Sequence, residues 1–229
     1  MVATSHDVMP DIELYQPTDE ATALALANTL GSDGWLLGGG QDTYGWLKDR
    51  NKTPAAMIEL TQVDAWKGIR ETADGVEIGA VTTITEIATN PLIQSRYALL
   101  STAAGRVASP QIRNVGTLGG NLVQDARCWC YRRGFDCYRA GGNICYADSP
   151  EGLNREHALF GSSRCVAVSP SDTAPALVAL DATMVVSSVG GQRLIAAQDF
   201  FVGPARDITH MTVLNEGEIL TAVRIPNTW

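Results

Sequence analysis

The chain has 229 residues, a formal net charge of −8, and 45% hydrophobic and 18% charged residues. This is the composition of a globular protein that is long enough to bury a sizeable core. The acidic balance argues against a nucleic-acid-binding protein, which would carry a basic stripe. No apolar run approaches the roughly 18 residues that a membrane-spanning helix needs, so we expect no membrane insertion. Residues 1–10 lack the basic and apolar regions of a signal peptide. We therefore expect a cytoplasmic protein, unless a partner that carries a signal exports it to the periplasm.

The N-terminal half predicts alternating helices and strands from its caps, turns and apolar runs. The expected elements are a helix at 19–30 capped by Thr18, strands at 34–37, 55–60, 66–71 and 76–80, a short helix that begins with the capping box Thr83–Glu86, and a longer helix from Pro91 to about Val107.

The C-terminal half begins with polar, Gly-rich residues 108–120, which predict a loop, and residues 125–164 then show no periodicity. The later pattern predicts a strand at 165–169, a helix at 175–180, a hairpin of 183–188 with 193–196 around Gly190-Gly191, and a final strand at 218–225. This order predicts the α+β fold class.

A first glycine loop follows the strand expected at 34–37, in the segment Leu36–Asp42. Its three glycines, Gly38, Gly39 and Gly40, allow close backbone approach, and successive N–H groups there can bind a pyrophosphate. The spacing matches neither the dinucleotide-binding nor the P-loop motif. A tight strand-to-helix turn is the alternative interpretation.

A second glycine loop, from Ala108 to Asn121, combines Gly119-Gly120 with hydroxyl and amide groups. Arg113 could pair with a phosphate or anchor the loop. The alternative is a polar connection whose side chains cap helices. Two such loops in one chain suit a long ligand with a charged middle.

The segments Leu37–Asp42 and Ile112–Asn121 resemble the two FAD motifs of the molybdenum hydroxylase flavoprotein subunits. That family includes the FAD domain of xanthine dehydrogenase, the medium subunit of carbon monoxide dehydrogenase and the β subunit of 4-hydroxybenzoyl-CoA reductase. The resemblance extends through Ser169–Asp172 and Glu218–Leu220. It implies one FAD-binding domain of the vanillyl-alcohol oxidase (PCMH) type over 1–229, with lobes at about 10–60 and 61–229 and FAD between them.

The same resemblance implies which residues bind FAD, with Asp172 at the ribityl or adenosine region and Ile219 or Leu220 on the flavin ring. An N-cap is the alternative role for Asp172. The complete implied set is Leu36, Leu37, Gly38, Gly39, Gly40, Gln41, Asp42 and Thr43 around the pyrophosphate, then Ala108, Ser109, Arg113, Thr117, Gly120, Asn121, Asp172, Ile219 and Leu220. Family members usually continue into a C-terminal domain that covers the flavin, and this chain ends at Trp229. We therefore expect that domain to be absent and the flavin to be more exposed.

The cysteines are confined to one stretch: all five, Cys128, Cys130, Cys137, Cys145 and Cys165, lie between positions 128 and 165. An odd count excludes a complete disulfide framework within the chain. The spacing is not the C-x₂-C of ferredoxins or zinc ribbons. The residues alone leave a metal cluster, a zinc site, free buried thiols, or one or two disulfides open.

The segment 125–165 resembles a cysteine-bearing insertion of some family members, which binds a [4Fe–4S] cluster. It is most similar to the version in the FAD subunit of the bacterial periplasmic aldehyde oxidoreductase. By that resemblance Cys128, Cys137, Cys145 and Cys165 are the metal ligands, and Cys130 is a spare thiol. We expect His157 to be a structural residue of the insertion; a ligand role is the alternative.

The chain has no motif that indicates substrate chemistry of its own, so we expect no catalytic residues. The resemblance implies an FAD- and [4Fe–4S]-containing electron-transfer subunit of a molybdenum hydroxylase, of the aldehyde oxidoreductase or xanthine dehydrogenase type. Its partners would be a molybdenum cofactor-binding large subunit and a small [2Fe–2S] subunit, and FAD would pass electrons to an external acceptor. The alternatives are a stand-alone FAD-dependent oxidase, the FAD subunit of a hydroxybenzoyl-CoA reductase-like enzyme, and a non-catalytic module with a zinc knuckle.

Overall fold

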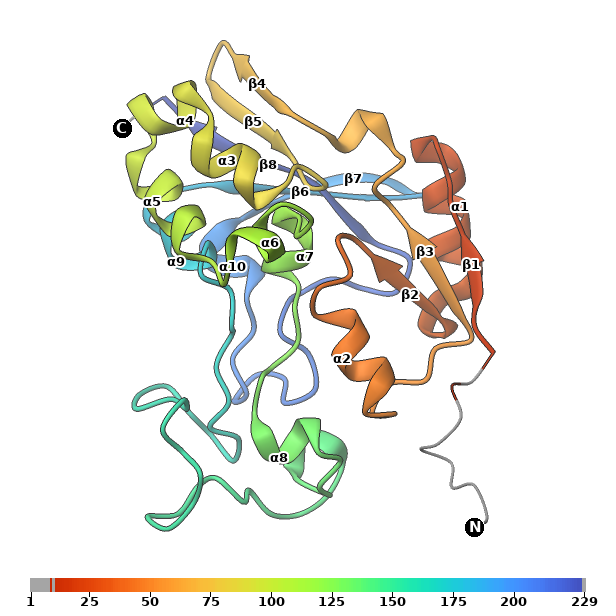
Figure 1. The fold of residues 1–229 in the computed structure, drawn as a ribbon, viewed down its shortest axis with the longest axis vertical. Helices are drawn as coiled ribbons and strands as arrows, with labels where there is room; N and C mark the ends of the chain where they lie inside the picture. Colours follow the sequence, from red (N-terminus) through yellow and green to blue (C-terminus); the bar gives the residue numbers. More distant parts are fainter. Residues whose placement is uncertain (1–8, 10, 228–229) are drawn as a thin grey trace.

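Two β-sheets of different kinds organise the chain in this computed structural model, which describes Met9 and residues 11–227 (Figure 1). The smaller sheet is parallel, with the order β1-β3-β2; its strands are β1 (Glu13–Tyr15), β2 (Gly34–Leu37) and β3 (Ala56–Glu59). Helix α1 (Glu20–Leu30) buries Ala23 and Ala27 in a core that also contains Ile58 of β3. A 3₁₀ helix, η1 (Gly31–Asp33), leads from α1 into β2.

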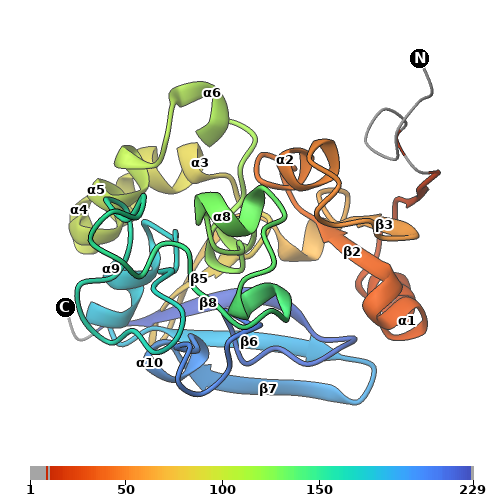
Figure 2. The same ribbon diagram turned by 90° about the horizontal axis from the view of Figure 1, so that it is seen from below.

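The larger sheet is antiparallel and has five strands in the order β4-β5-β8-β6-β7. Its strands are β4 (Ile69–Thr72), β5 (Gly75–Gly79), β6 (Thr183–Ser188), β7 (Gly191–Ala196) and β8 (Ile219–Pro226). Figures 1 and 2 show a layer of helices on one face of this sheet, and the main core lies between the two. The layer contains α3 (Ile84–Thr89), α4 (Pro91–Arg96), α5 (Ala98–Arg106), α9 (Ala174–Ala179) and α10 (Ala197–Phe200).

The remaining helices are short and lie in the connections. They are α2 (Thr43–Lys48), η2 (Asp64–Trp66), α6 (Pro110–Arg113), α7 (Leu118–Leu122), α8 (Trp129–Arg132) and η3 (Tyr138–Ala140). None of the helices in the described part of the chain combines the length and apolarity that a membrane crossing requires. The mixture of helices and strands that the sequence predicts is confirmed. Most of residues 1–10, on which the export prediction rests, lie outside the described residues.

Three sequence-based predictions of where an element begins or continues are wrong. Asp19, not Thr18, caps α1, since its carboxylate accepts the backbone N–H of Thr22 at 2.8 Å. The strand predicted from residue 66 begins only at Ile69, after η2. The helix predicted from 91 to 107 breaks at Tyr97, whose buried ring places its hydroxyl 3.3 Å from the Pro226 carbonyl oxygen.

The predicted strand at 165–169 is also absent from the structure. Its backbone forms hydrogen bonds within the cysteine segment and does not pair with a strand of either sheet. Ala158 N–H donates to the Val166 carbonyl oxygen at 2.8 Å, and Cys165 forms only an isolated bridge with Ser163. Residues 108–120, predicted as a loop, contain α6 and the start of α7.

The cysteine segment, residues 125–165, lies at the end of the molecule away from the five-stranded sheet (Figure 1). Side chains from the region around α2 hold it there. Asn51 Nδ2 donates to the Arg132 carbonyl oxygen, and Lys52 Nζ lies 2.9 Å from the Tyr131 hydroxyl. The cysteine segment is therefore attached to the loop region that follows β2.

Candidate functional site at the two glycine loops

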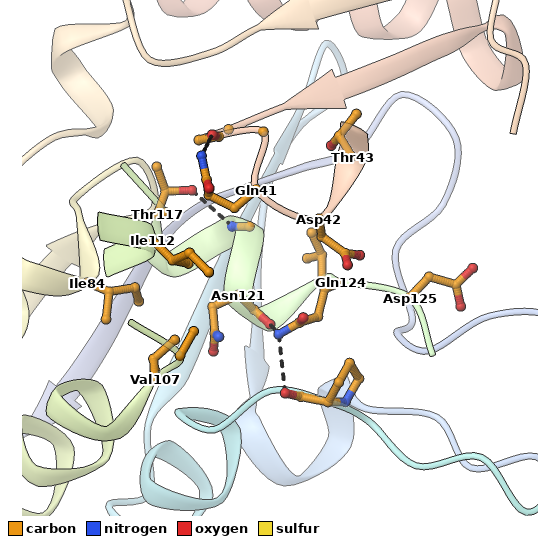
Figure 3. A pocket seen from close by; sticks show the side chains of 18 of the residues that line it. Gln41, Asp42, Thr43, Ile84, Val107, Ile112, Thr117, Asn121, Gln124 and Asp125 are labelled. Atoms are coloured by element: carbon orange, nitrogen blue, oxygen red, sulfur yellow. Dashed lines mark hydrogen bonds between the residues drawn. The ribbon is translucent and has the colours of Figure 1, made fainter. Parts of the chain in front are cut away.

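A pocket of about 430 Å³ opens where the loop after β2 meets the second glycine loop (Figure 3). Segments far apart in sequence form its wall. Of the residues predicted to bind FAD, those that line it are Leu36, Gly38, Gly39, Gly40, Gln41, Asp42, Thr43, Ala108, Thr117, Gly120, Asn121 and Asp172. Sequence reasoning missed the rest of the wall, which consists of Trp35, Ile84, Val107, Ile112, Gly116, Val123, Gln124, Asp125, Arg127 and Pro170.

Glycines are required where the two loops touch. A Cβ atom on Gly38 would lie 2.5 Å from Thr117 Oγ1, and one on Gly39 would lie 1.9 Å from the Val115 carbonyl oxygen. Real Cβ atoms do not approach backbone so closely. The first loop therefore needs its glycines to pack against the second loop, and this packing forms the pocket.

The backbone N–H groups of the first loop lack a hydrogen-bond acceptor among the described residues. Within the described residues, none of the N–H groups of residues 38–43 donates a hydrogen bond. Gly40 has φ +72°, and its carbonyl oxygen accepts Tyr44 N–H as α2 begins. Successive unpaired N–H groups around a positive-φ residue form a concave site for an anion.

Several polar side chains of the second loop form hydrogen bonds within the loop and so stabilise its conformation. Thr117 caps α7 through its hydroxyl, which accepts Gly120 N–H at 3.1 Å, and Ser109 caps α6 by accepting Ile112 N–H. Arg113 Nη1 donates to the Val107 carbonyl oxygen at 2.7 Å, so this side chain anchors the loop. Ser109 and Arg113 lie outside the pocket lining, whereas Ala108, with φ +39°, lies within it.

Asp172 presents a free carboxylate at the pocket. Ser171, not Asp172, hydrogen-bonds the start of α9, because its hydroxyl accepts Ala174 N–H at 3.1 Å. Asn121 Oδ1 accepts the hydroxyls of Ser171 and Thr173, each at 2.7 Å, which fixes this segment beside α7. The exposed Asp172 side chain bonds to no residue in the described part of the chain. The N-cap interpretation of Asp172 is therefore wrong.

Ile219 and Leu220 do not line the pocket, and neither does Leu37. Both β8 residues are buried, with 1% and 5% exposure. Successive side chains of a strand point to opposite faces, so Ile219 packs in the core with α1, whereas Leu220 packs in the main core. Both side chains thus belong to the core, and the contact of Ile219 or Leu220 with the flavin ring stays a prediction.

Two carboxylates of the pocket wall, Asp42 and Asp125, form ion pairs with arginines of the cysteine segment, and Asp125 also pairs with Lys52. Asp42 accepts Arg132 at 2.6 Å. Asp125 forms ion pairs with Arg139 at 2.5 Å and Lys52 at 3.5 Å. The sequence contained a signal for this, since Arg127, Arg132, Arg133 and Arg139 cluster in an otherwise acidic chain. The two regions therefore share a network of charges.

The five cysteines all line one small cavity inside their segment, together with residues such as Tyr131 and Arg139. All five thiols are free, so the structure contains none of the disulfides that the sequence left open. Burial raises the pKa of the Cys130 thiol, and the nearby Cys128 raises it further. Across Met9 and residues 11–227, no three or more His, Cys, Asp or Glu side chains are arranged to hold a metal ion.

Buried polar atoms without partners concentrate in the same segment. Arg139 Nε and both ring nitrogens of His157 are buried without a hydrogen bond to the described residues; the other such side-chain atom is Trp66 Nε1. Leaving such a group unsatisfied costs about 1–3 kcal/mol, more for a charged one. The interior of the cysteine segment thus contains polar atoms, among them the Arg139 Nε–H donor, that have no hydrogen-bond partner among the described residues.

A family model described as the FAD-binding domain in molybdopterin dehydrogenase matches residues 10–228. The chain belongs to this family. Among its relatives, the carbon monoxide dehydrogenase medium chain of Hydrogenophaga pseudoflava is 30% identical over 220 residues, which are 96% of this chain and 60% of the relative. The aldehyde oxidoreductase FAD-binding subunit PaoB of Escherichia coli is 34% identical over 195 residues, 83% of this chain and 61% of the relative.

A solved structure of a related enzyme has a similar fold over this FAD-binding domain. The crystal structure of a Cu,Mo-CO dehydrogenase matches with a TM-score of 0.70 and 26% identity, over 96% of this chain and 60% of that one. The chain thus spans about 60% of the length of these relatives. The family predicted from the two glycine motifs is confirmed.

The pocket of this FAD-binding domain fits FAD by its chemistry. The unpaired N–H groups of residues 38–43 suit a pyrophosphate, which is the charged middle of FAD. The wall combines apolar residues such as Ile84 and Val107 with polar groups such as Asn121, as expected for a cofactor that has aromatic rings and a sugar.

Proposed function

We propose that the chain is the FAD subunit of a molybdenum-dependent dehydrogenase that oxidises an aldehyde or an aromatic heterocycle. In this role FAD receives electrons from a small [2Fe–2S] subunit, which receives them from the molybdenum cofactor-binding large subunit, and passes them to an external acceptor. The observation that carries the proposal is the pocket whose loop at 38–43 offers unpaired N–H groups, in a chain of this family. The names of its relatives, which include aldehyde oxidoreductase and nicotinate dehydrogenase subunits, support the substrate class.

The proposal includes a [4Fe–4S] cluster with Cys128, Cys137, Cys145 and Cys165 as ligands. Two observations support it, although the thiols are not arranged to hold a metal ion in the described structure: all of them line one cavity, and a buried arginine with an unpartnered Nε–H lines the same cavity. Thiolates bound to iron carry negative charge, and such a charge supplies the acceptor that Arg139 lacks. Cys130 lines the same cavity and stays a non-ligand in this assignment.

We further propose the domain organisation that the resemblance implies. The parallel sheet with α1 belongs to a first lobe at about 10–60, and the five-stranded sheet belongs to a second lobe at about 61–229, of the PCMH type. Residues 125–165 are an insertion that carries the cluster. We place the protein in the cytoplasm, or in the periplasm after export together with a signal-bearing partner.

The test is a visible absorption spectrum of the purified chain after incubation with FAD, with flavin, iron, sulfide and zinc measured on the same sample. We expect the two visible flavin bands on a broad iron–sulfur absorbance, with iron and sulfide in equal amounts. A chain that takes up no flavin contradicts the FAD role. A zinc-loaded chain without iron contradicts the cluster, and oxidation of substrate by the isolated chain indicates a stand-alone oxidase.

Asp172→Ala is expected to weaken FAD binding about tenfold, the effect of losing one hydrogen bond to a charged group. Stability should change by less than about 0.5 kcal/mol, because the exposed side chain has no partner within the described structure. Asp33→Ala removes another exposed carboxylate, which does not line the pocket, and serves as the control. Flavin fluorescence titration and thermal unfolding measure both effects. Equal FAD affinity in the two variants would exclude Asp172 from the site.

A further inference from the structure

Arg139 is the most deeply buried charge in the described ion pairs, with 4% of its side chain exposed. It lies in η3, two residues after Cys137, and lines the cysteine cavity. Nη1 donates to the Ile208 carbonyl oxygen at 2.8 Å, and Nη2 donates to Asp125 Oδ1 at 2.5 Å. These two bonds fix the plane of the guanidinium and leave Nε–H unpartnered.

The charge of Arg139 acts on the cysteine site. Its side chain lines the cavity together with Cys137, Cys165 and the other cysteines, so its buried positive charge lies beside their thiols. Asp125 forms an ion pair with the guanidinium and also lines the FAD pocket. One buried ion pair therefore contacts both candidate cofactor sites.

We propose that Arg139 is a positioning residue of the cysteine site, whose Nε–H donates to a sulfur of the anionic cluster held there and thereby raises its reduction potential. This inference rests on the proposed cluster assignment. Reduction adds negative charge to the cluster, and a fixed buried cation with an N–H···S hydrogen bond stabilises the reduced state more than the oxidised one. Asp125 and the Ile208 carbonyl oxygen keep the donor in place.

The chain provides a matched control in Arg164, which lines the same cavity but is exposed and lies over the Tyr138 ring at 5.9 Å. Solvent screens its charge, so its influence on the cavity is weaker. Arg139→Gln and Arg164→Gln each remove one positive charge next to the cysteine cavity, the first from a buried side chain and the second from an exposed one.

The first experiment is a redox titration of the purified chain, monitored by EPR of the reduced cluster. We expect Arg139→Gln to lower the equilibrium constant for one-electron reduction about tenfold, which is a potential about 59 mV lower. Arg164→Gln should change the constant much less. Equal shifts in the two variants, or no shift in Arg139→Gln, would overturn the role of Arg139. A wild-type chain without iron would instead refute the proposed cluster.

The second experiment uses the unsubstituted chain, in case Arg139→Gln does not load iron. Pulsed EPR of the reduced cluster is compared between chains grown with ordinary arginine and with ¹⁵N-labelled arginine. We expect a nitrogen coupling that changes with the label and persists in Arg164→Gln. A reduced cluster without any arginine nitrogen coupling would rule out the proposed N–H···S hydrogen bond.

Discussion

Gly39→Ala is expected to abolish FAD binding and to lower the free energy of unfolding by about 1–3 kcal/mol, the usual cost of overpacking. The added Cβ would lie 1.9 Å from the Val115 carbonyl oxygen and 2.5 Å from the Val115 carbonyl carbon. Both are backbone atoms, so no side-chain rotation relieves the clash. The loops must separate, and the N–H groups of residues 38–43 then lose their positions relative to the second loop.

Gly105→Ala is the matched control for this prediction. Gly105 lies in α5, and a Cβ there meets nothing within 4 Å. Alanine favours helix over glycine by up to about 1 kcal/mol, so this variant should be as stable as the parent or more stable. Flavin content after gel filtration and thermal unfolding compare the two. If Gly39→Ala retains its flavin, the contact between the loops does not form the FAD site.

Local signals in the sequence predicted much of the fold. The capping box of Thr83 and Glu86 starts α3 as expected, and the turn after Ala73 joins β4 to β5. These features depend on residues three or fewer positions apart, so a local sequence pattern is enough to predict them. Tyr97 shows the limit: it breaks a helical pattern because its buried ring and hydroxyl meet Pro226, far along the chain.

The candidate site also has a part that could be predicted from local sequence signals and a part that could not. The two glycine loops predicted about half of the pocket wall, because glycine is the residue type that allows close backbone approach. The two roles considered for Asp172, ligand contact and N-cap, could not be separated from sequence, and only the three-dimensional structure shows that the Ser171 hydroxyl accepts the Ala174 N–H at the start of α9. Asp125 and Arg139 were missed because their pairing requires the fold of an aperiodic segment.

Cys145→Ser is expected to remove most of the iron, lowering the content more than about tenfold. Loss of a supporting residue costs 10–100-fold in metal affinity, and this change removes a proposed ligand. Cys145 is half-buried and lines the cavity with the other thiols. The flavin content should stay close to that of the parent, because Cys145 does not line the FAD pocket.

Cys130→Ser makes the same chemical change in the same cavity and is the matched control. Cys130 is buried close to Cys128, so spacing alone does not distinguish a ligand from a neighbour. If the proposed set is correct, Cys130→Ser retains its iron and sulfide whereas Cys145→Ser loses both. The reverse result would make Cys130 a ligand in place of Cys145. Equal retention in both variants would mean that iron is held elsewhere, and the buried Nε–H of Arg139 would then need another acceptor.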